Sequence, residues 1–198
     1  MSTSPSAFTS IHSRRGQTLV EALIALSVLT AGFVGIVTLL SKSFQLNRTA
    51  GNDTQATYLA SEGIEIAKNI IDYDVYYGFG QGGGTNPAAY DWQCSFQLGE
   101  GQTADYALAY DTVVSGCSAP PLVSAAGNKL YFDSTSDPTH GLYSYNNAYT
   151  RTNFTRDVYI SVPAGSPNEL DVQSTVKWSS GLSSNTVTLE DHFYNWHP

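Results

Sequence analysis

A single carboxylate, Glu21, lies inside an otherwise uncharged apolar stretch that runs from Gln17 to Leu40. A lone acid at membrane depth is energetically unfavourable, so it is by default a functional residue that needs a cationic partner. The stretch itself contains no basic residue. If the chain were cut after Gly16, the new α-amino group of Gln17 would lie one helical turn from the Glu21 carboxylate. In a packed assembly the same cation could come from a neighbouring subunit. The chemistry predicted for Glu21 is therefore ion pairing.

The two cysteines, Cys94 and Cys117, lie far beyond the apolar stretch and belong to no CxxC pair. No histidine cluster accompanies them, which argues against a zinc site. In a domain outside the cytoplasm a disulfide is the favoured state. Closing a loop of this length would stabilise the fold by about 3 kcal/mol in the chain-entropy account. Two buried free thiols are the alternative.

Other residues that could support catalysis or ligand binding form no recognisable pattern. His140, His192 and His197 are scattered, and the sequence contains no HExxH, GxSxG or P-loop motif. The glycine-rich GFGQGGG follows no strand and precedes no base, so it is interpreted as a surface linker. Asp133 and Asp137 lack the spacing of a calcium loop, which favours a solvated loop. We therefore expect no enzyme activity, no metal and no cofactor.

The composition excludes one class of partner. The formal net charge is −8 and only 13% of the residues are charged. Binding to a phosphate backbone needs clustered Lys and Arg, so no direct contact with nucleic acid is expected. A chain rich in Tyr, Gly, Ser and Thr with few charges suits an extracytoplasmic, β-rich domain.

The N-terminal stretch is predicted to be a lasting membrane anchor. As a helix, residues 17–40 would extend about 36 Å, which is enough to span a bilayer core. Arg14 and Arg15 precede the stretch and favour an orientation with the N-terminus inside, although basic residues also follow it. A secretory signal would be cut beyond its apolar core. Here the processing candidate, Gly16, comes before that core, so cleavage would leave the helix on the mature protein.

Helical periodicity returns in residues 41–72, after Gly51 and Asn52, which are plausible points of local melting. The apolar residues that recur there at helical spacing are Ala56, Leu59, Ala60, Gly63, Ile64, Ala67, Ile70 and Ile71. This pattern predicts an amphipathic second half of one long helix, which would end near Asp72 and pack on a sheet.

The sheet is predicted in residues 151–198 as a three-stranded antiparallel meander. Alternation places Phe154, Val158, Ile160 and Val162 on one face of the first strand, Leu170, Val172, Val176 and Trp178 on one face of the second, and Val187 and Leu189 on one face of the third. Residues 73–150, with both cysteines, are expected to form a looser Gly- and Tyr-rich variable region. The predicted fold class is α+β, with the second half of the helix packed on the sheet.

The junction RRG-QTLVEALIAL resembles the leader and helix start of type IV prepilins. In that family a prepilin peptidase cuts after a glycine that follows basic residues, and the new first residue is usually N-methylated. The glutamate at mature position five is the hallmark of the family. The resemblance implies a leader of residues 1–16 ending at Gly16, a methylated N-terminus at Gln17, and an assembly role for Glu21. This sequence departs from the family at one position: the first mature residue would be Gln17, where the family usually has Phe.

The resemblance further implies a structural subunit of a type IV pilus-like filament, most similar to a minor pilin. Before assembly the chain would sit in the inner membrane, with its C-terminal domain outside the cytoplasm. Its partners would be the prepilin peptidase and other pilin subunits, in a filament at the cell surface or in the periplasm. The alternatives are a pseudopilin of a type II secretion or competence system, and a single-pass anchored surface binding protein that does not polymerise.

Overall fold

A computed structural model describes residues 17–76, 92–114, 128–134, 141–180 and 183–195. The chain divides into two compact units, Met1–Arg48 and Thr49–Pro198. The elements are a helix α1 (Gln17–Tyr76) and the strands β1 (Thr103–Tyr106), β2 (Lys129–Phe132), β3 (Tyr143–Ser144), β4 (Thr150–Ser161), β5 (Glu169–Ser180) and β6 (Ser183–Tyr194). The first unit contains the first half of α1, and the second unit contains the rest.

The second unit is built on one antiparallel sheet with the order β3-β2-β4-β5-β6. The strands β4, β5 and β6 form the predicted meander, with Phe154 opposite Trp178 and Val176 opposite Val187. On its other edge, β4 pairs with β2 near its start and with β1 near its end. The sheet is therefore larger than the three strands predicted.

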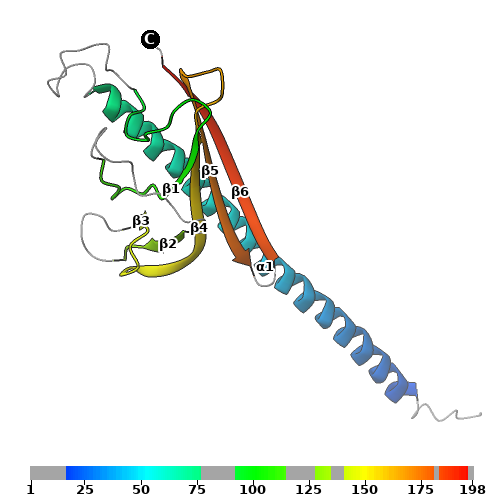
Figure 1. Cartoon of the computed structure of the whole chain (residues 1–198). Helices are drawn as coiled ribbons and strands as arrows, with labels where there is room; N and C mark the ends of the chain where they lie inside the picture. The colour runs from blue at the N-terminus through cyan, green and yellow to red at the C-terminus, as the bar shows by residue number, and fades with distance from the viewer. Residues whose placement is uncertain (1–16, 77–91, 115–127, 135–140, 181–182, 196–198) are drawn as a thin grey trace, which may run out of the picture. The chain divides into compact units, whose positions relative to one another are not determined.

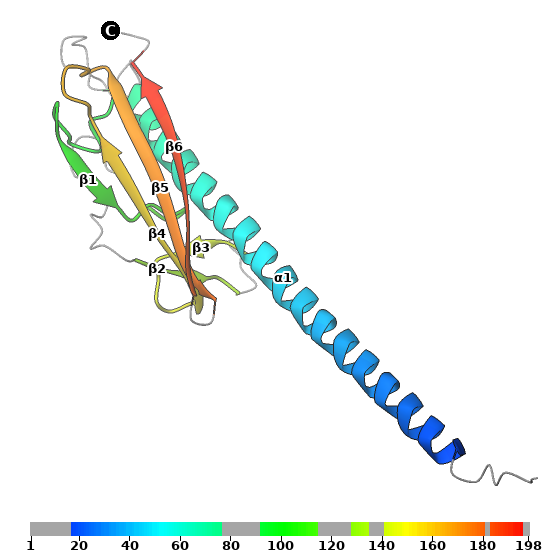
Figure 2. The same cartoon turned by 90° about the vertical axis from the view of Figure 1, so that its right-hand side faces the viewer.

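The α+β fold class is confirmed, because the second half of α1 packs on this sheet. Figures 1 and 2 show the second half of α1 running along one face of the strands. Its buried residues are Ala56, Leu59, Ala60, Gly63, Ala67, Ile70, Ile71 and Asp74. All of these except Asp74 belong to the predicted apolar stripe. Since helical spacing alone placed those positions on one face, the sheet-facing side of this helix could be predicted from sequence.

Gly63 lets the helix approach the sheet closely. A Cβ built at Gly63 would lie 2.5 Å from the Ser174 Oγ and 3.1 Å from the Val158 Cγ2. Both partners lie on the sheet face that points to the helix, and both are fully buried. A larger residue would therefore push α1 away from β4 and β5.

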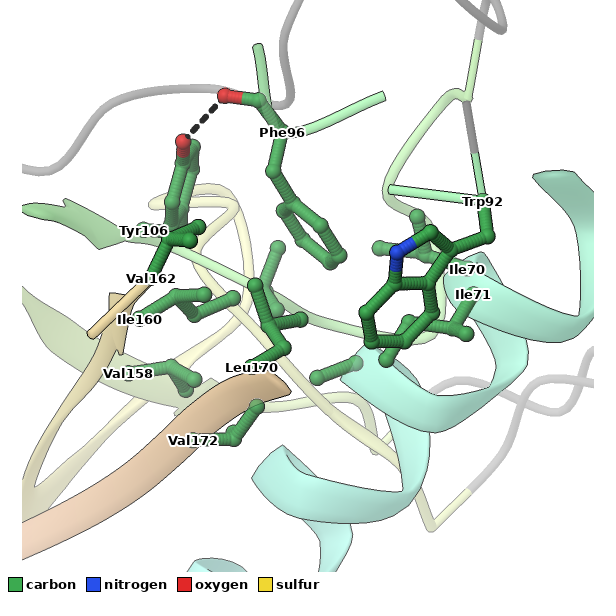
Figure 3. Packing of buried hydrophobic residues seen from close by; sticks show 12 residues of the cluster. Ile70, Ile71, Trp92, Phe96, Tyr106, Val158, Ile160, Val162, Leu170 and Val172 are labelled. Carbon is green, nitrogen blue, oxygen red and sulfur yellow. Dashed lines mark hydrogen bonds between the residues drawn. The ribbon is translucent and has the colours of Figure 1, made fainter. Parts of the chain in front are cut away.

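The part of the chain that connects α1 to β4 contributes side chains to the hydrophobic core. Trp92, Phe96 and Tyr106 pack with Ile70 of the helix and Ile160 of β4 (Figure 3). The Tyr106 hydroxyl donates a hydrogen bond of 2.6 Å to the Phe96 carbonyl, and the two rings meet edge to face at 5.4 Å. The part of residues 73–150 that the structure describes is thus less loose than the sequence indicated.

The helix is also longer and more regular than predicted. It runs without interruption through Gly51 and Asn52 and ends at Tyr76, four residues beyond the predicted end. In its last turn the buried Asp74 carboxylate accepts hydrogen bonds from the Ser95 backbone N–H (2.9 Å) and the Ser95 hydroxyl (2.5 Å). These contacts tie the end of α1 to the segment that precedes β1.

Candidate functional site

The first half of α1 presents apolar side chains on every side. In the monomer these large residues are between 45% and 72% exposed: Leu19, Val20, Leu23, Ile24, Leu26, Val28, Leu29, Phe33, Val34, Ile36, Val37, Leu39, Leu40, Phe44 and Leu46. A helix that is apolar all round is buried in a membrane or in a protein core. Among the described residues, α1 is one helix that is long and apolar enough to cross a membrane. We call residues 17–46, which contain the apolar stretch 17–40 and also Lys42, the apolar segment.

Four hydroxyl groups of the apolar segment, those of Ser27, Thr30, Thr38 and Ser41, are satisfied within the helix. Ser27 donates to the Leu23 carbonyl at 2.5 Å, and Thr38 donates to the Val34 carbonyl at 2.8 Å. Thr30 and Ser41 bond to the preceding turn in the same way. Such bonds allow a hydroxyl to enter an apolar environment without an unpaired donor.

Glu21 differs from these hydroxyl residues. It lies on the exposed surface of α1, and its side chain makes no hydrogen bond or ion pair with any residue that the structure describes. Gln17 is the first residue of α1, four positions earlier, so the two share one face with a rise of about 6 Å between them. Gly16 lies outside the described residues. Cleavage after Gly16 and methylation of Gln17 stay predictions.

Only one of the two cysteines can be placed. Cys94 is 9% exposed, in the turn that precedes Phe96, and the described part of the chain contains no free cysteine. Cys117 lies outside the described residues. The Cys94–Cys117 disulfide therefore stays a prediction.

Arg156 is a central residue of the second unit that no sequence pattern indicated. Its side chain is completely buried between the helix and the sheet. The guanidinium donates hydrogen bonds to the Leu59 carbonyl of α1 (2.9 Å) and to the Leu108 carbonyl that follows β1 (2.6 Å). Its Nη1 also lies 3.4 Å from the Glu62 carboxylate. One side chain of β4 thus joins three segments that are distant in sequence.

Tyr145 completes the surroundings of Arg156. The guanidinium carbon lies 5.9 Å from the Tyr145 ring centroid, and the Tyr145 hydroxyl donates to the Arg156 carbonyl at 3.1 Å. Burial raises the pKa of Tyr145, and the Arg156 charge opposes that shift. The cation is therefore held by neutral carbonyls, an aromatic face and one partly exposed acid.

An apolar groove lies beside this centre, lined by Ala50, Gly51, Thr54, Gln55, Tyr58, Leu59, Glu62, Gly141 and Tyr143. Three of its polar side chains, Gln55, Glu62 and Tyr143, are engaged with protein groups. The Gln55 amide donates to the Tyr143 hydroxyl, and Glu62 faces Arg156. Burial raises the pKa of Tyr143.

Of the remaining residues weighed in the sequence, the structure describes Asp133 and His192. Asp133 is buried, and its backbone N–H bonds the Leu142 carbonyl, whereas Asp137 lies outside the described residues. His140 and His197 also lie outside them. His192 lies on β6 next to Asp171 of β5, an arrangement that the sequence analysis missed. The alternation of polar residues places both side chains on exposed strand faces. The pairing of His192 with Asp171 follows only from the register between the two strands, which the sequence does not give.

Comparisons of the chain with protein-family models, curated proteins and solved structures give no match.

Proposed function

We propose that this chain is a structural subunit of a type IV pilus-like filament, most similar to a minor pilin, and not an enzyme. The observation that carries the proposal is Glu21, an acid whose side chain has no partner among the described residues, in an exposed helix stretch, residues 17–40, with no other charged residue. An apolar segment alone would serve any membrane anchor. An acid one turn after a predicted new N-terminus gives that segment a specific assembly contact.

In the proposed mechanism, prepilin peptidase cuts after Gly16 while the apolar segment holds the chain in the inner membrane. The α-amino group of Gln17, N-methylated and still basic, becomes a cation at the start of α1. In the filament this cation pairs with Glu21 of the same or a neighbouring subunit. Pairing offsets the burial of both charges, and an unpaired acid disfavours packing in the wrong register.

The second unit plays a different part in this proposal. Its sheet and the second half of α1 form a folded domain that would face outward from the filament, outside the cytoplasm. The sequence resemblance also admits a pseudopilin of a type II secretion or competence system, which would use the same processing and the same helix. An anchored binding protein that does not polymerise would need neither cleavage after Gly16 nor Glu21.

The mature N-terminus tests the proposal directly. We expect mass spectrometry of the protein from the native membrane to find an N-terminus at Gln17, 14 Da heavier when it is monomethylated. A Gly16→Leu variant serves as the control and should keep its leader while still entering the membrane. An intact Met1 terminus, or a cut beyond Leu40, would contradict the pilin proposal.

The disulfide between Cys94 and Cys117 is proposed as part of the same extracytoplasmic domain. The burial of Cys94 supports it, and so does the absence of a free cysteine from the described residues. Peptide maps with and without reduction should differ by one linked pair. Two peptides that react fully with an alkylating reagent before reduction would instead show free thiols.

A further inference from the structure

Three metal-binding side chains meet on the sheet surface at the end of the β5–β6 hairpin. Asp171 and His192 are directly opposite each other in register, and Glu169 lies opposite Tyr194 in the next pair on the same face. Their neighbours Leu170 and Val172 are buried in the core, so Glu169 and Asp171 lie on the opposite face of the sheet. His192 has a side chain that is 47% exposed, so the cluster is open to solvent.

The ligand atoms converge on one point. The His192 Nδ1 lies 2.6 Å from the Asp171 Oδ1 and 3.3 Å from the Glu169 Oε1. One ligand atom from each of the three residues lies within 4.8 Å of the others. Tetrahedral zinc, with bonds of about 2.1 Å, places its ligands about 3.4 Å apart. The His192–Glu169 separation fits this geometry, and the His192–Asp171 contact would open by about 0.8 Å.

One surrounding group, Tyr194, holds a carboxylate of the cluster as an outer contact of a zinc site does, and an acid lies near the second ring nitrogen of His192. A histidine that ligates zinc usually presents its other ring nitrogen to a carboxylate, which fixes the ring. Here Nδ1 faces the two carboxylates, and the His192 Nε2 lies 3.9 Å from the Glu190 Oε1. The Tyr194 hydroxyl donates a hydrogen bond of 2.9 Å to the Glu169 Oε1. The Asp191 carboxylate accepts the His192 backbone N–H at 2.9 Å.

We propose that Glu169, Asp171 and His192 form a binding site for a divalent transition-metal ion such as Zn²⁺, with water in the fourth position. One imidazole and two carboxylates suit zinc better than calcium, which takes six to eight oxygen ligands. Two carboxylates also balance the charge of the ion, on a chain with a formal net charge of −8. The ion would clamp β6, which pairs with β5 at the end of the sheet, to its neighbour. This site does not depend on the proposed filament function.

Isothermal titration of the untagged full chain in detergent micelles with Zn²⁺ tests the site. We expect saturable binding of one ion per chain. His192→Gln and Asp171→Asn should each weaken binding at least ten-fold, whereas the exposed control Glu65→Gln should bind as the wild type does. Circular dichroism and thermal unfolding of the metal-free variants check that each one folds, and Glu169→Gln provides a third test if one of them does not.

Three results would overturn the proposal. If the wild-type protein shows no saturable heat with Zn²⁺, the three side chains form only a cross-strand ion pair and no metal site. Binding that is unchanged in His192→Gln would place the ion elsewhere, on residues outside this cluster. Displacement of Zn²⁺ by an equal concentration of Ca²⁺ would indicate an oxygen-only acidic surface without the imidazole. A ring-proton shift of His192 on adding Zn²⁺, measured by NMR, would support it independently.

Discussion

At the scale of single residues, Arg156 concentrates the contacts that hold α1 to the sheet. A guanidinium without solvent contact needs every donor satisfied, because burying a charge without partners is strongly unfavourable. Here carbonyl oxygens of Leu59 and Leu108 accept from Nη1 and Nη2. Alternation along β4 already placed position 156 on the same face as Phe154 and Val158. The burial of Arg156 could not be predicted, because an arginine is rarely buried and its acceptors are backbone groups that leave no trace in the sequence.

Replacing Arg156 should destabilise the domain more than replacing its acidic partner. Arg156→Met keeps the length of the side chain but removes the donor to the buried Leu108 carbonyl and the second donor to the Leu59 carbonyl, which keeps only its helical bond. We therefore expect a loss of about 3 kcal/mol in the free energy of unfolding. Glu62→Gln should cost about 1 kcal/mol, because the Glu62 side chain is 33% exposed and its charge is partly screened. Urea unfolding in detergent, followed by tryptophan fluorescence, measures both. Equal losses would show that the ion pair, and not the carbonyl bonds, dominates.

The burial of Tyr106 predicts that the folded chain loses stability at high pH. Burial raises the pKa of Tyr106 from 10.0 to about 12. Below pH 10 its phenol is protonated in both the folded and unfolded chains, so the stabilisation is complete. Between pH 10 and about 12 the unfolded chain loses this proton first, so the stability of the folded chain falls by up to about 2.7 kcal/mol.

The matched variant for this prediction is Tyr106→Phe. At neutral pH it should lose about 1 kcal/mol, because the Phe96 carbonyl loses its donor. Between pH 10 and 12 its stability should fall less steeply than that of the wild type, since other tyrosines contribute equally to both proteins. Chemical unfolding at intervals across this range measures the difference. Parallel pH profiles would contradict the buried-phenol account.

At the scale of elements, the long elements could be predicted and the short ones could not. The second half of α1 and the strands β4 and β5 carry many apolar residues at period 3.6 or 2, so their buried faces were predicted correctly. The strands β1 and β2 have four residues each, which is too few for a period to emerge. Each one forms because β4 offers a free edge, and that contact is not local.

Two glycines of α1 should respond to the same substitution in opposite directions. Nothing lies within 4 Å of a Cβ built at Gly51, so Gly51→Ala should raise the free energy of unfolding by about 0.5–1 kcal/mol through helix propensity. At Gly63 the Cβ would lie 2.5 Å from the Ser174 Oγ, so Gly63→Ala should lower that free energy by about 1–3 kcal/mol. Urea unfolding of both variants measures the pair.

Ser174→Ala provides the control for Gly63. The Ser174 hydroxyl has no hydrogen-bond partner among the described residues, so its removal alone should be nearly neutral. Combined with Gly63→Ala it should restore part of the lost stability, because the shortest contact disappears while the Ser174 Cβ contact of 3.2 Å stays. A double variant no more stable than Gly63→Ala would place the strain elsewhere, most directly at Val158.

At the scale of the whole molecule, one continuous helix serves two different environments. In its second half, apolar residues occupy one face and are buried on the sheet. In its first half, they occupy every face and stay exposed in the monomer. The sequence predicted this change from its patterns alone. It could not provide the partner of Glu21, because no described residue of the same chain supplies a cation there.

Glu21→Ala should separate processing from assembly. The variant keeps Gly16 and the apolar segment, so we expect cleavage and membrane retention to match the wild type. Without the acid, the Gln17 amine of a packed subunit loses its partner. A pairing energy of about 1.4 kcal/mol or more would reduce incorporation into filaments at least ten-fold. Immunoblots of sheared filaments and of membranes measure the two pools.

The matched control for Glu21 is Ser27→Ala, within the same apolar segment. The Ser27 hydroxyl bonds only the Leu23 carbonyl of its own helix, so its loss leaves no group that needs another subunit. Ser27→Ala should therefore enter filaments as the wild type does, whereas Glu21→Ala should accumulate in the membrane with its leader removed. Equal incorporation of both variants would refute pairing as the role of Glu21, and a low level in both would point to general sensitivity of the helix surface.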